Sequence, residues 1–139
     1  MRYIKLPKTD MEVSQIQLGS AEYGLESQYP GMKAVPTQDA FAQMDEFVDM
    51  GGNFIDTAHV YSDWIPGEFG RSEKCIGKWF SSRKSRSKVF LATKGGIDFT
   101  NHVGLYGPPI DLSKKEIDND IEESLTNLQT DYIDLFQFH

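Results

Sequence analysis

The chain of 139 residues has little cysteine, no excess of positive charge and no long apolar run. Its single cysteine, Cys75, excludes a disulfide within the chain and is typical of a reducing compartment. The formal net charge of -7 disfavours a non-specific nucleic-acid or anionic-membrane surface. No stretch approaches the roughly 18 apolar residues of a membrane span, and the start, "MRYIKLPKTD", lacks the apolar region of a signal peptide. We therefore expect a cytoplasmic protein that forms one unit over residues 1–139.

Hydrophobic patterning predicts strands that alternate with helices. Residues 2–18 are typical of a short hairpin, with a turn at residues 7–10, followed by a strand that ends near Leu18. Three further strands are expected at residues 53–55, 88–93 and 132–138, the second apolar enough to be buried on both faces of a parallel sheet. The order of elements favours parallel pairing through right-handed crossovers.

Three helices are predicted between these strands. One begins at Thr37 and ends at Gly51-Gly52, a second begins near Ser72, and a third follows a capping box of Ser113 and Glu116. The side chains expected to face the core are Phe41, Met44, Val48, Cys75, Ile76, Trp79, Phe80, Ile117, Ile121, Leu125 and Leu128. Two long connections, residues 24–36 and 95–112, each follow a strand and are expected to be lids or binding loops.

Titratable side chains follow three of the predicted strands. Asp56, Lys94 and His139 each come directly after a strand, and Tyr61 lies five residues beyond Asp56. Parallel α/β folds place their chemistry at this rim, where side chains from several strands converge. Each residue also has an ordinary structural explanation: a turn former for Asp56, half-buried packing for Tyr61, a solvated strand end for Lys94 and a frayed terminus for His139.

Together the four side chains suit proton transfer to or from an oxygen. A tyrosine with a pKa near 10 becomes an effective acid or base when a neighbouring lysine favours the phenolate. A carboxylate would hold the lysine, and a histidine would orient a carbonyl oxygen or share its proton. A hydride moving at carbon would have to come from a cofactor.

The three histidines also permit a metal-site hypothesis. His59, His102 and His139 lack the spacing of a helical ligand pair, so we expect no metal site. His59 is interpreted instead as a loop residue that faces solvent or a substrate pocket, and His102 as part of a lid. The acidic residues 118–123 are expected to be a solvated helix face.

At these residues the sequence resembles the aldo-keto reductase superfamily. The stretches "GGNFIDTAHVY", "GRSEKCIGKWF", "VFLATKGG" and "SLTNLQTDYIDLFQFH" are similar, in order, to the family's segments around its acid, tyrosine, lysine and histidine. "LGSAEYG" resembles the end of the family's first strand, and "YSDWIPGEFGRSE" is most similar to bacterial, aryl-alcohol-dehydrogenase-like members. The resemblance covers nearly the whole chain.

The resemblance implies a role for each residue of the rim. Tyr61 would be the general acid/base, Lys94 would lower its pKa, Asp56 would partner Lys94, and His139 would orient the carbonyl. Gly19, Ser20 and Asp56 would lie beside the nicotinamide end of NADP(H). Ser20 stands where the family commonly has threonine, and a hydroxyl is retained.

The family fold is a (β/α)8 barrel of about 250 residues, and this sequence supplies an N-terminal β-hairpin and the first half, about four β/α units. The resemblance therefore implies a truncated NADP(H)-dependent reductase of aldehydes or ketones, without the later loops that grip the cofactor. A catalytically silent half-barrel fragment or interaction module is the alternative, and a regulatory binding subunit is a third. The expected partners are a small carbonyl or alcohol substrate and a second or complementary half-barrel, because a half-barrel exposes unpaired edges.

Overall fold

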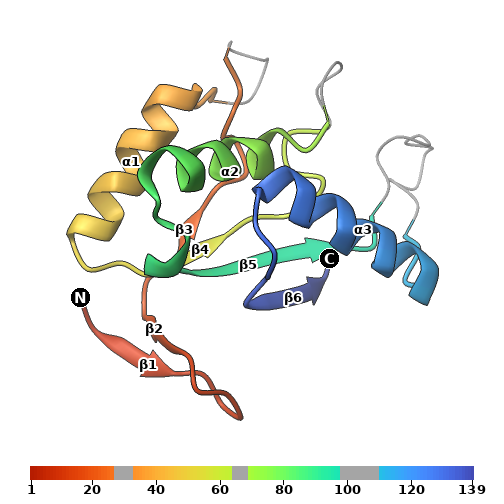
Figure 1. The fold of residues 1–139 in the computed structure, drawn as a ribbon, viewed down its shortest axis with the longest axis horizontal. Helices are drawn as coiled ribbons and strands as arrows, with labels where there is room; N and C mark the ends of the chain where they lie inside the picture. Colours follow the sequence, from red (N-terminus) through yellow and green to blue (C-terminus); the bar gives the residue numbers. More distant parts are fainter. Residues whose placement is uncertain (27–32, 64–68, 98–109) are drawn as a thin grey trace.

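The computed structural model describes residues 1–26, 33–63, 69–97 and 110–139. Within them, four strands form a parallel sheet in the order of the sequence (Figure 1). These strands are β3 (Leu18–Gly19), β4 (Phe54–Asp56), β5 (Phe90–Gly95) and β6 (Leu135–Phe138). Their neighbouring pairs are all parallel, which confirms the predicted pairing.

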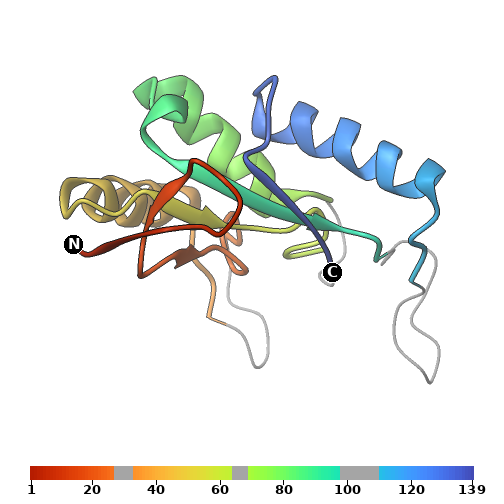
Figure 2. The same cartoon turned by 90° about the horizontal axis from the view of Figure 1, so that it is seen from below.

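Three helices lie along one face of this sheet (Figures 1 and 2). They are α1 (Thr37–Asp49), α2 (Arg71–Arg83) and α3 (Lys114–Leu128), close to the predicted bounds. The Ser113 hydroxyl accepts a hydrogen bond from the Glu116 N–H and so caps α3, as the capping motif predicts. No helix in the described part of the chain is long and apolar enough to span a membrane.

The N-terminal hairpin forms as predicted and packs at the start of the parallel strands. β1 (Tyr3–Lys5) pairs antiparallel with β2 (Glu12–Ser14). The Ser14 N–H donates to Asn53 Oδ1 at 2.7 Å and the Asn53 side chain donates to Glu12 O at 3.0 Å, which ties β2 to the residue before β4. The hairpin therefore fixes the end of the sheet opposite to the predicted catalytic rim.

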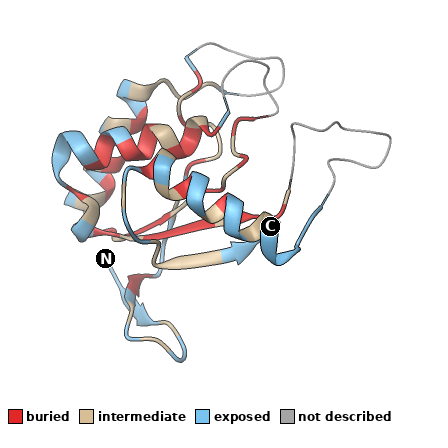
Figure 3. Cartoon of the chain, turned by 45° about the vertical axis from the view of Figure 1, so that its right-hand side comes forward, coloured by how far each residue is buried: buried red, intermediate tan, exposed pale blue. Residues whose placement is uncertain are grey.

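The main core lies between the helices and the sheet, where buried residues gather (Figure 3). Met44 of α1, Trp79 of α2 and Leu128 of α3 are almost fully buried against Ile55 and Leu91 of the sheet. Cys75 is also buried, which agrees with its expected packing role. Burial of such side chains is worth roughly 1.5–3 kcal/mol each, so this layer supplies most of the force that holds the helices on the sheet.

The predicted inward face of α3 is wrong in part. Its buried residues are Asp120, Ser124 and Leu128, whereas Ile117, Ile121 and Leu125 are only half-buried. The helix is turned toward the sheet because Asp120 accepts a hydrogen bond from the Gly96 N–H, at the end of β5, at 2.6 Å. The acidic residues 118–123 are therefore not simply a solvated face.

Several strand bounds differ from the prediction by one to three residues. A short 3-10 helix, η1 (Arg86–Lys88), occupies the expected start of β5, and β6 begins at Leu135. Asp56 and Lys94 are the last and the second-last residues of their strands, because main-chain pairing continues beyond the apolar run. The two long connections lie partly outside the described residues, at 27–32 and 98–109, and His102 falls within the second gap.

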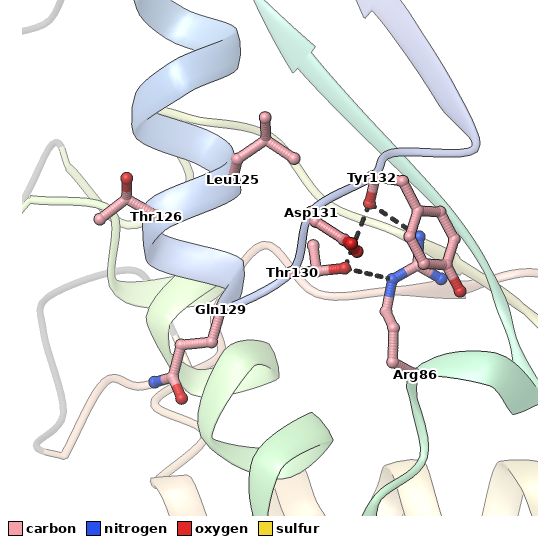
Figure 4. Close-up of a pocket in the computed structure, with 7 residues that line it drawn as sticks. All are labelled: Arg86, Leu125, Thr126, Gln129, Thr130, Asp131 and Tyr132. Carbon is pink, nitrogen blue, oxygen red and sulfur yellow. Dashed lines mark hydrogen bonds between the residues drawn. The ribbon is translucent and has the colours of Figure 1, made fainter.

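Arg86 clamps the starts of β5 and β6 together. Its guanidinium donates to Thr130 Oγ1, Val89 O, Tyr132 O and Asp134 Oδ2 at 2.8–3.1 Å and lies 3.7 Å from the centre of the Tyr132 ring. A surface hollow of about 660 Å³ lies beside this clamp (Figure 4), and its lining residues are Arg86, Leu125, Thr126, Gln129, Thr130, Asp131 and Tyr132. Because Arg86 is already occupied by protein partners, we assign this hollow a structural role.

Candidate active site

Strand pairing brings the predicted site residues to one rim of the sheet. Gly19 pairs with Asp56 across β3 and β4, and Lys94 pairs with Gln137 across β5 and β6. The His139 N–H donates to Gly95 O at 2.9 Å, which extends the ladder by one residue. All the strands are parallel, so these positions share the carboxyl-terminal edge.

The Lys94 ammonium is the centre of the cluster. Its Nζ donates to Asp56 Oδ2 at 2.7 Å, to the Thr57 carbonyl oxygen at 2.8 Å and to the Tyr61 hydroxyl oxygen at 3.1 Å. The Lys94 and Asp56 side chains are 15% and 14% exposed, so water screens their ion pair only weakly. An ammonium has three protons to donate, and all three are accounted for.

His139 faces Tyr61 from the end of β6. The two rings meet edge to face, with centroids 5.7 Å apart and an interplanar angle of 78°. Burial, followed by the nearby Lys94 charge, lowers the pKa of His139 below its usual value of 6.5, against a smaller opposing effect of Asp56. At neutral pH the imidazole is therefore uncharged and offers one N–H donor.

Gly19 and Ser20 lie at the other side of the rim, where Gly19 is exposed and Ser20 is buried. Gly19 is exposed, and a Cβ placed there would meet nothing within 4 Å, so the strand end is bare. Ser20 is 1% exposed and its hydroxyl donates to Asp56 O at 2.9 Å. The Ser20 side chain thus holds the backbone beneath Asp56.

A buried hydroxyl network supports this backbone and was missed by sequence reasoning. Ser72 Oγ lies within hydrogen-bond distance of Ser20 O, Ser20 Oγ and Thr57 Oγ1, at 2.7, 2.9 and 3.0 Å. These three side chains link the first turn of α2 to the ends of β3 and β4. The available signal in the sequence was the position of Ser72, three and four residues before Cys75 and Ile76, which places it on the predicted inward face of the helix.

His59 does not face solvent or a substrate pocket, so the interpretation from sequence is wrong. Its side chain is 15% exposed and lies among carboxylates of Glu73 in α2 and of Asp120 and Glu123 in α3. Side chains of α2 and α3 thus surround the imidazole. Within the described ranges no group of three His, Cys, Asp or Glu side chains is suited to hold a metal ion.

Comparison with known proteins shows the family of the chain. Residues 15–139 match the model of the aldo/keto reductase family. The chain belongs to this family. It is 35% identical to Protein tas of Escherichia coli, covering 100% of this chain and 38% of that protein. It is 33% identical to an aryl-alcohol dehydrogenase of Phanerodontia chrysosporium whose name specifies NADP(+). That match covers 96% of this chain and 34% of the dehydrogenase.

A solved aldo-keto reductase structure has the same fold. AKR11C1 from Bacillus halodurans, in its holo form, matches with a TM-score of 0.76 at 33% identity, covering 100% of this chain and 40% of that one. The prediction of a partial (β/α)8 barrel is thereby confirmed. This aldo-keto reductase chain spans between 34% and 40% of the length of these three relatives.

Proposed function

We propose that this chain carries the proton-transfer residues of an NADP(H)-dependent aldo-keto reductase that reduces an aldehyde or a ketone to an alcohol. The observation that carries the proposal is the Lys94 ammonium, which donates at once to Asp56 Oδ2 and to the Tyr61 hydroxyl oxygen. NADPH, when bound, would supply the hydride that is added to the carbonyl carbon.

In this proposal Tyr61 gives its hydroxyl proton to the carbonyl oxygen. The ammonium of Lys94, 3.1 Å from the phenol oxygen, stabilises the negative charge that remains there. Asp56 holds the ammonium in place. Uncharged His139, whose ring meets Tyr61 edge to face, donates its N–H to the carbonyl and fixes the direction from which the oxygen approaches.

The residues of the rim suit the approach of a nicotinamide ring. Gly19 leaves open space at the end of β3 directly beside Asp56, its partner in the ladder. Ser20 would contribute by holding Asp56 from below rather than by exposing its own hydroxyl. The choice of NADP(H) is supported by the aryl-alcohol dehydrogenase, whose name specifies NADP(+).

Two measurements test the proposal. Titration of the purified chain with NADPH, followed by nicotinamide fluorescence, should show saturable binding. Tyr61→Phe should then abolish aldehyde reduction while NADPH binding stays largely intact, because only the proton donor is removed. Turnover that survives in Tyr61→Phe would refute the role of Tyr61.

The alternative is a half-barrel that keeps the rim but is catalytically silent by itself. It is supported by the coverage, because the chain spans only 38% and 34% of the two named curated relatives. NADPH binding separates the two: no binding by a folded 139-residue chain favours the silent fragment, and the reductase then requires a complementary chain.

A further inference from the structure

A second charged cluster lies next to the Tyr61–Lys94 pair, between α2, α3 and the end of β5, and has His59 at its centre. His59, two residues before Tyr61, has its Nδ1 atom 3.8 Å from Glu73 Oε2, which is within ion-pair distance but too long for a hydrogen bond. Its Nε2 atom lies 3.8 Å from Asp120 Oδ1 and 3.4 Å from Glu123 Oε2. The Glu73 and Asp120 side chains are 0% and 8% exposed, whereas that of Glu123 is 69% exposed. The first two carboxylates are therefore the ones that water screens least.

The carboxylates of Glu73 and Asp120 also accept hydrogen bonds from neighbouring strands and helices. Glu73 Oε1 accepts from the Thr93 hydroxyl at 2.7 Å, and Glu73 Oε2 accepts from Asn127 Nδ2 at 3.2 Å. Asp120 Oδ2 accepts from the Gly96 N–H at 2.6 Å, while Oδ1 faces His59. The cluster thus joins α2, α3 and the end of β5 at one imidazole ring.

The surrounding charges favour the protonated form of His59. Burial disfavours the charge, but Glu73, followed by Asp120 and Glu123, outweighs it and raises the pKa of His59 to about 9. The charged groups that face the ring are Glu73 from α2, Asp120 and Glu123 from α3, and Asp63 from its own loop. From β5 the contact is the Lys94 carbonyl, which accepts from the His59 N–H at 2.9 Å.

The loop between His59 and Tyr61 leaves little freedom for independent movement. The Tyr61 N–H donates to Ala58 O and the Asp63 N–H donates to Val60 O, both at 3.1 Å, so consecutive tight turns connect the two side chains. A shift of the His59 backbone would be passed to the Tyr61 ring. The same shift would break the bond from the His59 N–H to Lys94 O, on the residue whose ammonium must meet Tyr61.

We propose that His59 is a positioning residue: ion pairs with Glu73 and Asp120 hold it in place, and through the loop it sets the distance between the Tyr61 hydroxyl and the Lys94 ammonium. The inference rests on the proposed function, in which that distance governs proton transfer. In this proposal the ion pairs fix the position of the ring, whatever their net contribution to stability. Glu73 and Asp120 act through His59 and contact neither of the proton-transfer atoms.

Amide hydrogen exchange of the folded 139-residue chain, read residue by residue by NMR, tests the inference without any need for turnover. Glu73→Gln keeps the shape of the side chain and removes its charge. We expect at least tenfold faster exchange at the amides of His59, Tyr61 and Asp63, together with a shifted Tyr61 ring signal. Amides of α1 should keep their protection. Glu122→Gln, which removes the charge of an exposed acid in α3, is the control and should change neither the exchange rates nor the Tyr61 signal.

Asp120→Asn provides a second test in case Glu73→Gln fails to fold, because the amide oxygen still accepts from the Gly96 N–H. A purely structural role predicts a uniform loss of protection over all helices and strands, or an unmoved Tyr61 signal in a folded variant. Either result would overturn the proposal. NADPH titration of the same samples distinguishes a failure of the positioning role from a failure of the proposed function. If the variants lose protection in the loop but the wild-type chain binds no NADPH, the positioning role is supported and only the proposed function is contradicted.

Discussion

Lys94 and Asp56 form an ion pair of 2.7 Å although 38 residues separate them in the sequence. Both side chains are about 85% covered, so each would be costly to bury without the other. The strand ladder brings them together, since Asp56 of β4 pairs with Ala92, two residues before Lys94 in β5. The pair thus depends on the sheet and in turn fixes the ammonium below Tyr61.

A double-mutant cycle measures this dependence. Asp56→Asn and Lys94→Met should each lower the free energy of unfolding by about 2–4 kcal/mol, because each leaves a buried charge without its partner. The double variant should lose less than the sum, with a coupling energy above about 1 kcal/mol by urea unfolding. Additive losses, within about 0.5 kcal/mol, would show that the pair contributes no interaction of its own.

His59 predicts how stability depends on pH. Its pKa is 6.5 when unfolded and about 9 when folded, so the folded state binds the proton more tightly. This contribution, roughly 3 kcal/mol, is fully present below pH 6.5 and is lost as the pH rises through 9. Urea unfolding between pH 7 and 9 should show this decline, and His59→Gln should largely remove it. Above pH 9 the buried Cys75 thiol adds a decline of its own, because burial raises its pKa from 9.0 to about 11.

Two other groups titrate outside this pH range and serve as internal checks. Burial raises the pKa of Asp63 to about 6. Its contribution to stability is therefore present below about pH 4 and is lost as the pH rises to about 6. The lowered pKa of His139 acts in the opposite direction, so its contribution is present above pH 6.5 and is lost as the pH falls. A wild-type chain with constant stability from pH 7 to 9 would contradict the assigned charge of His59.

The rim of the sheet was predictable from sequence, whereas the cluster behind it was not. Asp56, Lys94 and His139 each follow an apolar run, and that local pattern suffices to place them on one edge of a parallel sheet. The roles that the family resemblance assigns to them stay predictions. The error of one or two residues in the strand ends arises because backbone pairing does not stop where apolar residues do.

The His59 cluster depends instead on how two helices pack. Glu73 and Asp120 lie 47 residues apart, and each looks like an ordinary surface acid in a helical pattern. Their approach to His59 requires close contacts at glycines: a Cβ on Gly95 would lie 2.5 Å from Asp120 Oδ2. Hydrophobic periodicity carries no information about such contacts between helices and strands. It therefore predicts that the acidic side chains of residues 118–123 face solvent.

The isolated chain should associate through its sheet edges. In the described part of the sheet, β3 and β6 each have a neighbour on one side only, and Phe138 of β6 is 68% exposed. Unpaired edges and exposed aromatic surface favour pairing with a second copy or a complementary half-barrel. Sedimentation velocity should show mass that increases with concentration, and Phe138→Ser should reduce it. A folded chain that stays monomeric over the whole range would contradict this expectation.

Arg86→Lys tests the clamp at the opposite end of the sheet. Lysine keeps the charge but cannot donate to four oxygens at once or stack on Tyr132, so we expect a loss of about 2–3 kcal/mol in unfolding free energy. NMR signals of Tyr61 and His139 should not move, because the clamp lies at the start of the strands. Shifts at those two rings would show that the two ends of the sheet are coupled.

Gly77→Ala should be destabilising although alanine is the better helix former. A Cβ at Gly77 would overlap the Asn127 carbonyl oxygen and lie 2.8 Å from the Leu128 carbonyl carbon, so α2 and α3 would have to separate. Overpacking against backbone costs about 1–3 kcal/mol and outweighs the gain of about 1 kcal/mol in helix propensity. The displaced end of α3 carries Asn127, which donates to Glu73, so the separation should also disturb His59. Lys78→Ala, at the exposed neighbouring position, is the control and should leave the Tm nearly unchanged. An unchanged or higher Tm for Gly77→Ala would mean that the two helices can move apart without cost, and that the geometry around Glu73 is not set by their contact.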